Sequence, residues 1–346
     1  MRLSLGHFIR DQYGPVPPLV SVNLSGKTVM VVGANTGVGF EATKHFAGMN
    51  PGRLIMACRN PAKGEAAVER LKRETGFKRV ELWIIDLAVF ASVLDFARKF
   101  EEDGGRLDIV VQNAGVLNFD HIETVDGWEN SIQVNNLSLP LLAFLLLPRM
   151  VQTGKEHGTT PRLVMVSSEV HYWGDIEKDA LESGDILGTL SSKAYCTTRI
   201  MNRRYFDSKL INILFLRAFN DRFPKTPGTM IATSVTPGYS FSELRRNYKG
   251  IRAFADWIAE RLLATTAEVG SRQLIYASVG GTDIEDELRG AYITRSKVRE
   301  VSDFAFTKEG KKAQEDLWNE TIKILVGVDP KVQQILDTYF VPKTGA

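Results

Sequence analysis

Short, uninterrupted runs of apolar residues alternate along the chain with longer segments in which apolar and charged positions recur at helical spacing. After a proline-rich lead-in, helical patterns begin at Phe40 and extend over Ala62–Thr75 and Ala91–Glu102. Apolar runs of this length predict strands that are buried on both faces of a parallel sheet. The six runs are Lys27–Val32, Arg53–Cys58, Arg79–Ile85, Leu107–Gln112, Arg162–Ser167 and Thr229–Val235.

This alternation predicts an α/β protein built on a single doubly wound parallel sheet, a Rossmann fold, with helices on both faces. A chain of 346 residues with no internal repeat and no clear linker fits a single domain. We expect an N-terminal lead-in at residues 1–25, the domain at residues 26–330 and a C-terminal tail at residues 331–346. The region from about Lys308 predicts a helical C-terminal extension with a packing role.

The longest apolar stretch, Leu137–Leu147, is interrupted by Pro140 and is shorter than a membrane span of about 20 residues. It predicts a buried helix. The first 26 residues lack the charged start and the apolar core of a signal peptide. We therefore expect a cytoplasmic protein with no membrane span.

Composition and charge narrow the function classes. Hydrophobic residues make up 44% and charged residues 24% of the chain, and the formal net charge is +2. These values are typical of a soluble globular protein and predict no general attraction to nucleic acid or anionic lipid. Cys58 and Cys196 lie far apart and the five histidines form no metal-ligand spacing. We expect a buried thiol at Cys58, a reducing compartment and no metal site.

A glycine-rich turn follows the first predicted strand. Its sequence, GANTGVG, has the pattern G-x-x-x-G-x-G and lies where a strand passes into a helix. Glycines there allow backbone amides to approach a pyrophosphate, and a helix N-terminus adds partial positive charge. The alternative is a tight turn with no ligand. The candidate phosphate-binding residues are Gly33, Asn35, Thr36, Gly37, Val38 and Gly39.

Arg59 follows the second predicted strand, where an NAD-binding protein usually presents an acidic side chain to the ribose hydroxyls. An arginine can instead pair with a 2′-phosphate, so Arg59 favours NADP(H) over NAD(H). A solvated surface arginine is the alternative. Asp86 ends the third strand, at the sheet edge where ligands bind, and its alternative role is the N-cap of the next helix.

Tyr205 and Lys209 are spaced four residues apart within Ser192–Phe219, a segment of helical composition without internal glycine or proline. On a helix they share one face. A phenol close to an ammonium and to a positive nicotinamide ring has a lowered pKa and can act as acid or base on an alcohol or carbonyl. A serine hydroxyl would complete such a site by orienting the substrate oxygen, and Ser167 and Ser168 are the candidates.

Together these motifs identify the chain, over roughly residues 25 to 330, as resembling the short-chain dehydrogenase/reductase family. The resemblance assigns Ser168, Tyr205 and Lys209 to catalysis and implies that Asn135 holds a water in the proton relay, with Asn136 as the alternative. The chain departs from the family pattern at three positions, with Val32 and Ser242 where threonine is common and Gln112 where asparagine is common. The implied cofactor-binding residues beyond the glycine turn are Arg59, Asp86, Leu87, Asn113, Ala114, Gly115, Tyr205, Lys209, Pro237 and Gly238.

The segments ANTGVGFEA, ACRN and YFDSKLINILF are similar to those of the retinol-dehydrogenase-like branch, which is common among fungal biosynthetic ketoreductases. The resemblance therefore implies a reductase of secondary-metabolite biosynthesis. It also implies a possible homodimer formed through two long helices, Gly127–Met150 and Ser192–Phe219. The apolar Leu137–Leu147 stretch fits that interface and would equally fit the interior of a monomer.

These inferences predict an NADP(H)-dependent oxidoreductase. It would transfer a hydride between the nicotinamide and a ketone, aldehyde or secondary alcohol of a lipophilic, ring-containing molecule. The pocket should be closed by Glu169–Leu190 and Tyr239–Arg252, with an aromatic lining from Tyr172, Trp173, Tyr239 and Phe241. One alternative is a non-redox isomerisation or cyclisation with NADP as a structural cofactor. Another is a regulatory NADP-binding protein without turnover.

Overall fold

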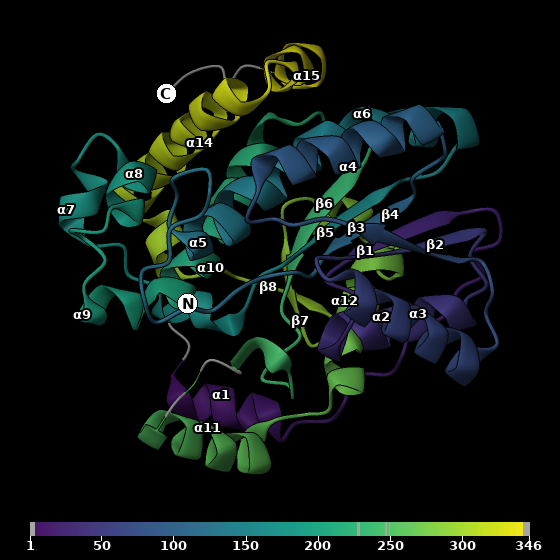
Figure 1. The fold of residues 1–346 in the computed structure, drawn as a ribbon, viewed down its shortest axis with the longest axis horizontal. Helices are drawn as coiled ribbons and strands as arrows, with labels where there is room; N and C mark the ends of the chain where they lie inside the picture. Colours follow the sequence, from purple (N-terminus) through teal and green to yellow (C-terminus); the bar gives the residue numbers. More distant parts are fainter. Residues whose placement is uncertain (1–3, 227–228, 246–247, 249, 342–346) are drawn as a thin grey trace.

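A central sheet of eight strands organises the molecule (Figure 1). The computed structural model describes residues 4–226, 229–245, 248 and 250–341. The strand order is β3-β2-β1-β4-β5-β6-β7-β8, with parallel pairing up to β7 and an antiparallel β8 at one edge. The strands are β1 (Thr28–Val32), β2 (Arg53–Cys58), β3 (Val80–Ile84), β4 (Ile109–Gln112), β5 (Arg162–Val166), β6 (Ile231–Val235), β7 (Tyr292–Thr294) and β8 (Lys297–Arg299).

Helices cover both faces of this sheet, which confirms the doubly wound Rossmann architecture. Successive side chains of β1 point to opposite faces, so Met30 and Val32 join one buried cluster and Val29 and Val31 join the other. The first cluster includes α4 (Phe90–Asp103), α6 (Leu139–His157) and α10 (Arg204–Arg222); the second includes α2 (Gly37–Gly48), α3 (Pro61–Thr75) and α12 (Ala267–Val279).

The six strands that hydrophobic patterning predicts are all present, whereas β7 and β8 were not predicted because each has only three residues. Strand order reverses between β1 and β4, and this reversal creates a crevice at the carboxyl ends of the strands.

Several short helices connect the main elements. They are α5 (Asn130–Ile132), α7 (Lys178–Leu181), α8 (Ile186–Ser191), α9 (Thr198–Met201), α13 (Glu285–Leu288), the 3₁₀ helices η2 (Glu169–Trp173), η3 (Glu243–Arg245) and η4 (Asp303–Phe306), and the π-helix η1 (Gln133–Ser138).

The long helix predicted over Ser192–Phe219 is divided in the structure. Residues 192–197 are not helical and include a turn at 193–195, α9 follows, and α10 begins only at Arg204. The side chain of Thr197 caps α9, a start signal that the composition of the segment conceals. Both Tyr205 and Lys209 still lie on α10, so the prediction that they share one helix is correct.

The apolar stretch around Leu137–Leu147 is buried in the protein, as predicted. The continuous helical segment Asn130–His157 is long and apolar enough to cross a membrane, but 83% of its apolar window is buried inside the structure. A helix that is buried to this extent belongs to the core of the protein.

Two C-terminal helices, α14 (Lys308–Val328) and α15 (Lys331–Tyr339), confirm the predicted helical extension. The tail expected from residue 331 is in fact α15, whose Val332 is fully buried. On α14, Trp318 stacks on Phe215 of α10 with ring centres 5.7 Å apart, while α15 packs on α6 (Figure 1). These two helices pack on α10 and α6, the helices through which the family resemblance implies a homodimer, and the homodimer stays a prediction.

The N-terminal lead-in is also part of the folded structure. It contains α1 (Leu5–Gln12), which lies beside α11 (Gly250–Leu263) at the end of the molecule away from the sheet (Figure 1). Tyr13 donates a hydrogen bond from its hydroxyl to the carbonyl of Leu262 (2.7 Å), and Asp11 forms an ion pair with Arg299 (2.7 Å). Gln12 also donates from Nε2 to the carbonyl of Tyr239 (3.2 Å), so the lead-in lies against the segment that follows β6.

Candidate active site

A cleft of about 730 Å³ opens at the carboxyl ends of the strands. Its volume is that of a typical small-molecule site. Almost every residue that the sequence assigns to the site lines it; of the set, only Gly39 and Asn135 lie behind its wall. The lining includes Gly33, Asn35, Thr36, Gly37, Val38, Arg59, Asp86, Leu87, Asn113, Ala114, Gly115, Ser168, Tyr205, Lys209, Pro237 and Gly238.

The glycine turn has the geometry of a phosphate cradle. Gly33 (φ +85°) and Gly37 (φ +57°) adopt left-handed conformations, and a side chain at Gly33 would begin 2.8 Å from the backbone of Ala114. Asn113 braces the turn from β4, donating from Nδ2 to the carbonyl of Gly33 (2.9 Å). Thr36, the N-cap of α2, makes no side-chain capping bond. The first amides of α2 therefore face the cleft without a side-chain cap, as an anion-binding helix end requires.

Basic side chains mark the rim of the cleft next to β2. Arg59 is exposed and lines the cleft, as does Lys63 in the first turn of α3. Lys63 was missed in the sequence because only the fold brings that helical turn to the rim. Two cations at this position fit the 2′-phosphate of NADP(H).

Asp86 lies at the end of β3, on the cleft wall. Its Oδ1 accepts a hydrogen bond from the amide of Ala88 (2.9 Å), and Val89 rather than Asp86 is the N-cap of α4. The alternative of a helix N-cap is therefore wrong for Asp86, although its carboxylate does stabilise a local turn.

Ser168, Tyr205 and Lys209 come together beside the Pro237-Gly238 turn. The Ser168 side chain lowers the pKa of the Tyr205 phenol, and the Lys209 Nζ lies 5.5 Å from the centre of the Tyr205 ring. Ser168 also caps the 3₁₀ helix η2. Ser167 is buried and its hydroxyl donates to the carbonyl of Lys209 (3.2 Å), which favours Ser168 as the predicted site serine.

The electrostatics of this triad differ from the sequence expectation. Burial raises the pKa of the Tyr205 phenol well above 10, and the nearby cation that lowers it is Arg245 rather than Lys209. Burial lowers the pKa of Lys209 to about 8, and its Nζ donates to the carbonyl of Val166 (2.9 Å). Tyr205 therefore holds its proton at neutral pH, the state that a general acid requires.

Asn135 approaches the triad from η1, a π-helical segment of the kind often found at functional sites. A side chain at Gly115 would begin 3.3 Å from the Asn135 Oδ1 and 3.6 Å from the Lys209 Nζ, so both groups border the same narrow space. Asn136 instead donates to the backbone carbonyl of Ser208 (2.8 Å). Asn212, which sequence reasoning missed, donates to the carbonyl of Asn135 (2.6 Å). The geometry favours Asn135 over Asn136 as the residue next to Lys209.

The glutamine at position 112, where the family commonly has asparagine, has a structural role. Gln112 is buried at the end of β4 and donates from Nε2 to the carbonyl of Leu139 (2.9 Å), at the start of α6.

His171, which the sequence analysis missed, contacts the carbonyl of Ser168 through Nδ1 (2.7 Å). Burial lowers the pKa of His171 to about 4, so this imidazole is neutral and braces the serine.

The aromatic lining of the cleft is only partly as predicted. Trp173 and Tyr239 line it, but Tyr172 is buried with its hydroxyl bonded to the carbonyl of Glu300, and Phe241 is 41% exposed outside it. The missed members are Phe8, Phe206 and Tyr248. Phe8, from the lead-in, contacts both correctly predicted rings, with centre-to-centre distances of 5.7 Å to Trp173 and 6.3 Å to Tyr239.

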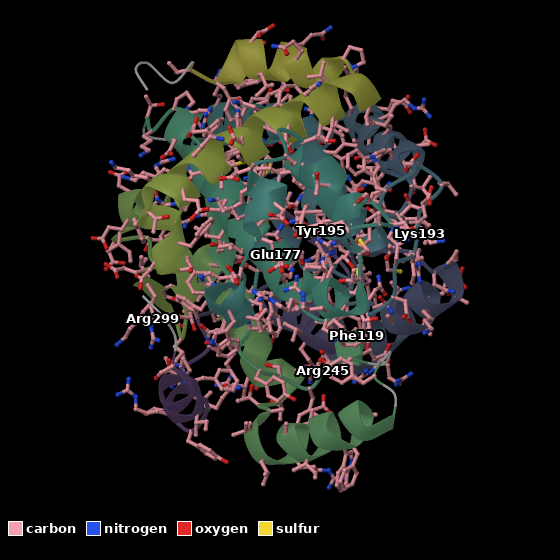
Figure 2. The ribbon with its side chains drawn as sticks, turned by 90° about the vertical axis from the view of Figure 1, so that its left-hand side faces the viewer. Phe119, Glu177, Lys193, Tyr195, Arg245 and Arg299 are labelled. Atoms are coloured by element: carbon pink, nitrogen blue, oxygen red, sulfur yellow. The ribbon has the colours of Figure 1, made fainter. Side chains whose placement is uncertain are left out.

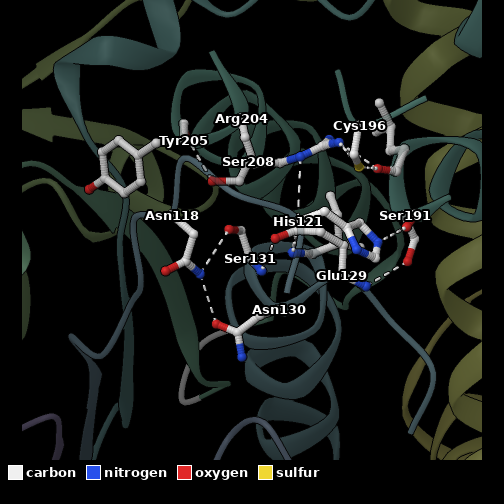
Figure 3. A network of polar contacts seen from close by, with 12 residues as sticks. Asn118, His121, Glu129, Asn130, Ser131, Ser191, Cys196, Arg204, Tyr205 and Ser208 are labelled. Atoms are coloured by element: carbon white, nitrogen blue, oxygen red, sulfur yellow. Dashed lines mark hydrogen bonds and ion pairs between the residues drawn. The ribbon is translucent and has the colours of Figure 1, made fainter. Parts of the chain in front are cut away.

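A buried ion pair fixes the start of α10, immediately before Tyr205 (Figure 3). The Arg204 Nε lies 3.4 Å from a carboxylate oxygen of Glu129, and neither side chain is exposed. The same carboxylate accepts hydrogen bonds from the amides of Ser131 (2.8 Å) and Ile132 (3.1 Å) at the start of α5. Figure 3 shows the Arg204 and Tyr205 side chains pointing in opposite directions, so the ion pair anchors the backbone that presents the phenol.

The part of the chain that the structure describes contains no group of three histidine, cysteine, aspartate or glutamate side chains that could hold a metal ion. Cys58 is buried and Cys196 is half-buried, and both are free thiols. The cleft itself is lined by hydroxyl, phenol, ammonium, carboxyl and thiol groups around the glycine turn.

Comparison with known proteins agrees with this site. Residues 27–174 match the family model described as short chain dehydrogenase. The short chain dehydrogenase/reductase dmxR8 of Cryptosporiopsis sp. is 32% identical over 94% of this chain and 98% of its own. The short-chain dehydrogenase anuD of Penicillium roqueforti is 33% identical over 96% of this chain and 86% of its own.

A solved gluconate 5-dehydrogenase from Burkholderia cenocepacia, in complex with NADP and tartrate, shares the fold. It aligns with a TM-score of 0.56 and 19% identity over 78% of this chain and 94% of its own. Given the matched relatives, the glycine turn and the assembled serine, tyrosine and lysine, the chain belongs to the short-chain dehydrogenase/reductase family.

Proposed function

We propose that this protein is an NADP(H)-dependent carbonyl reductase. It acts on a ketone or aldehyde of a lipophilic, ring-containing small molecule, and in reverse on the corresponding alcohol. The observation that carries the proposal is that Ser168, Tyr205 and Lys209 line one cleft, with the Lys209 Nζ 5.5 Å from the centre of the tyrosine ring, and that the same cleft contains an uncapped helix N-terminus.

Each group has a distinct part in the reduction. When bound, NADPH supplies a hydride to the carbonyl carbon. Ser168 orients the carbonyl oxygen through its hydroxyl, and Tyr205 donates its phenolic proton to the oxygen as negative charge develops there. The Arg245 guanidinium, which lowers the pKa of Tyr205, stabilises the phenolate that this transfer leaves behind, and the Lys209 ammonium, 5.5 Å from the centre of the ring, adds positive charge beside it. Asn135, beside Lys209, holds the water through which the tyrosine is reprotonated.

The cofactor preference rests on Arg59 and Lys63 at the rim of the cleft. An Arg59→Ala variant should raise KM for NADPH by about tenfold, the low end for a charge-assisted contact because this side chain is exposed. KM for NADH should stay within about twofold, because NADH lacks the 2′-phosphate. Steady-state kinetics with both cofactors measure the effect. The matched control is Arg98→Ala, which removes an exposed arginine from α4, outside the cleft. Equal losses with NADPH and NADH would contradict this assignment.

The substrate class follows from the walls of the cleft. Phe8, Trp173, Phe206 and Tyr239 give it an apolar, aromatic surface around the reactive groups. Rings of this kind favour flat, lipophilic substrates over sugars. With fungal short-chain dehydrogenases as relatives, we place the enzyme in secondary-metabolite biosynthesis. We place it in the cytoplasm, a reducing compartment in which its two cysteines remain free thiols.

The proposal is tested by turnover. Oxidation of NADPH, followed at the nicotinamide absorbance, should be supported by aromatic and polycyclic ketones and aldehydes and not by small sugars. Binding of NADPH without turnover of any carbonyl compound would contradict the redox function. Sugars as the best substrates would contradict the substrate class alone.

The pKa of Lys209 predicts how activity depends on pH. Since burial lowers this pKa to about 8, Lys209 is an ammonium below that pH and loses its charge above it. We therefore expect kcat/KM for carbonyl reduction to fall as pH rises through about 8. A pH profile measures this, with the unfolding temperature recorded at each pH to separate loss of charge from loss of structure. A profile that stays level well above pH 8 would contradict a role for the ammonium.

A further inference from the structure

Four aromatic side chains form a continuous row along the wall of the cleft, which we call the aromatic row. Phe206 directly follows the proposed proton donor in the sequence, and its ring centre lies 6.3 Å from that of Trp173. The ring of Phe8 comes next, 5.7 Å from Trp173 and 6.3 Å from Tyr239, which follows the proline–glycine turn. All four residues line the cleft. The row therefore connects the proton donor to the turn, with Phe8 between its other members.

Phe8 belongs to the lead-in, far in sequence from the rest of the row. Within the described positions 4–25, it is the one lead-in residue that lines this cleft. Its ring meets those of Trp173 and Tyr239 at 66° and 69°, so both contacts are edge-to-face. The side chain packs at the margin of the apolar core and is only half-buried. Part of its ring surface therefore remains open toward the cleft.

Polar contacts hold the lead-in in this position. Asp11, one helical turn after Phe8, forms an ion pair with Arg299 of β8 (2.7 Å), and Figure 2 shows Arg299 beside α1. Arg295, in the turn between β7 and β8, donates to the backbone carbonyl of Asp11. Gln12 donates to the carbonyl of Tyr239 (3.2 Å). These contacts place the Phe8 ring, so the ring does not itself have to anchor α1.

The aromatic row borders the space that the substrate must occupy. For reduction, the carbonyl oxygen has to lie at Ser168 and Tyr205, and the carbonyl carbon has to face the nicotinamide at the proline–glycine turn. These two requirements place the groups attached to the carbonyl carbon against the wall between Tyr205 and that turn. Phe8 occupies the middle of this wall. A flat ring attached directly to the carbonyl carbon can therefore pack on Phe8.

We propose that Phe8 is a specificity-determining residue, and that the substrate is a ketone or aldehyde whose carbonyl carbon is attached to a flat aromatic ring system. Packing of that ring against Phe8 and Trp173 removes apolar surface from water, and edge-to-face or stacked geometry adds to the attraction. A small aliphatic ketone cannot make this contact over a comparable area. The reduction itself rests on the proposed function, whereas the packing of the ring does not.

The test uses the full chain with two ketones, 2-acetylnaphthalene and 2-butanone. The Phe8→Ala variant should raise KM for 2-acetylnaphthalene by about tenfold, because the contact with one aromatic ring is lost. We expect kcat/KM for 2-butanone and Kd for NADPH to stay within about twofold, because neither ligand packs on this ring. Phe8→Tyr keeps the ring and should stay within about threefold of the wild type for both ketones.

The matched control is Ile9→Ala. Ile9 is the next residue of α1, is 37% exposed and lies outside the cleft, so its loss should leave both ketones unaffected. A second measurement needs no turnover. It is the Kd of 2-acetylnaphthalene for the protein saturated with NADP⁺, followed by quenching of tryptophan fluorescence, because Trp173 lines the cleft. This Kd should also rise about tenfold in Phe8→Ala and stay unchanged in Ile9→Ala.

Four results would overturn the role of Phe8. They are equal changes in Phe8→Ala and Ile9→Ala, equal losses for the two ketones, a Phe8→Tyr variant as impaired as Phe8→Ala, and a parallel loss of NADPH binding, which would assign Phe8 to folding. If ketones are turned over in any of these cases, the proposed function stands. If no ketone is turned over but Phe8→Ala alone weakens binding of 2-acetylnaphthalene, the proposed function fails and the role of Phe8 stands. Wild-type protein that neither binds nor reduces 2-acetylnaphthalene would contradict the substrate class and the role of Phe8 together.

Discussion

Replacing Tyr205 by phenylalanine is expected to lower kcat for carbonyl reduction by about 10²–10⁴-fold, the usual contribution of a positioned acid or base. Only the hydroxyl is lost, so the ring that packs against Lys209 and the wall of the cleft remains. Ser168 cannot replace the phenol as proton donor, because a serine hydroxyl is a far weaker acid. The Kd for NADPH should change by no more than about twofold, since the phosphate contacts lie elsewhere in the cleft.

The measurement is single-turnover oxidation of NADPH with saturating carbonyl substrate, together with cofactor titration by fluorescence. Tyr195→Phe is the matched control, because this tyrosine is half-buried near α10 and does not line the cleft. A Tyr205→Phe enzyme that retains more than about a tenth of wild-type kcat would show that another group donates the proton.

Replacing Glu129 by glutamine is expected to lower the free energy of unfolding by about 3–5 kcal/mol. The Arg204 guanidinium would stay buried and charged without its counter-ion, because arginine does not lose its proton in proteins. Glutamine can still accept one of the two amide hydrogen bonds that the carboxylate accepts at the start of α5. Most of the loss therefore comes from the uncompensated charge.

Urea denaturation followed by circular dichroism measures this loss, provided that unfolding is two-state. Glu182→Gln removes the same charge from an exposed ion pair with Lys178 (3.4 Å) and should cost less than about 0.5 kcal/mol. A difference between the two variants of less than about 1 kcal/mol would mean that Arg204 finds other partners. Since Arg204 precedes Tyr205, we also expect Glu129→Gln to lower kcat.

Sequence patterning predicted the parts of this protein that depend on local order. Buried strands require continuous apolar runs, and a phosphate-binding turn requires glycine where φ is positive, so β1 to β6 and Gly33 could be read directly. Tyr205 and Lys209 were identified because helical spacing places them on one face. Apolar runs, turn glycines and helical spacing can be recognised in the sequence without knowing which residues pack against them.

The features that were missed depend on long-range packing. Phe8 is an isolated apolar residue in a proline-rich lead-in, and nothing local indicates that it joins Trp173 and Tyr239 in the cleft. Tyr172 and Trp173 are adjacent, yet only one of them faces the cleft, because η2 turns their side chains in different directions. Arg245 lowers the pKa of Tyr205 from η3, forty residues further along the chain. Such relations exist only once the chain has folded.

The packing of α14 on α10 and of α15 on α6 also makes the end of the chain part of the support of the active site. Tyr205 and Lys209 lie on α10, and Trp318 of α14 stacks on Phe215 of the same helix. A change in the C-terminal helices would therefore reach the helix that presents Tyr205 and Lys209, although these helices lie outside the cleft.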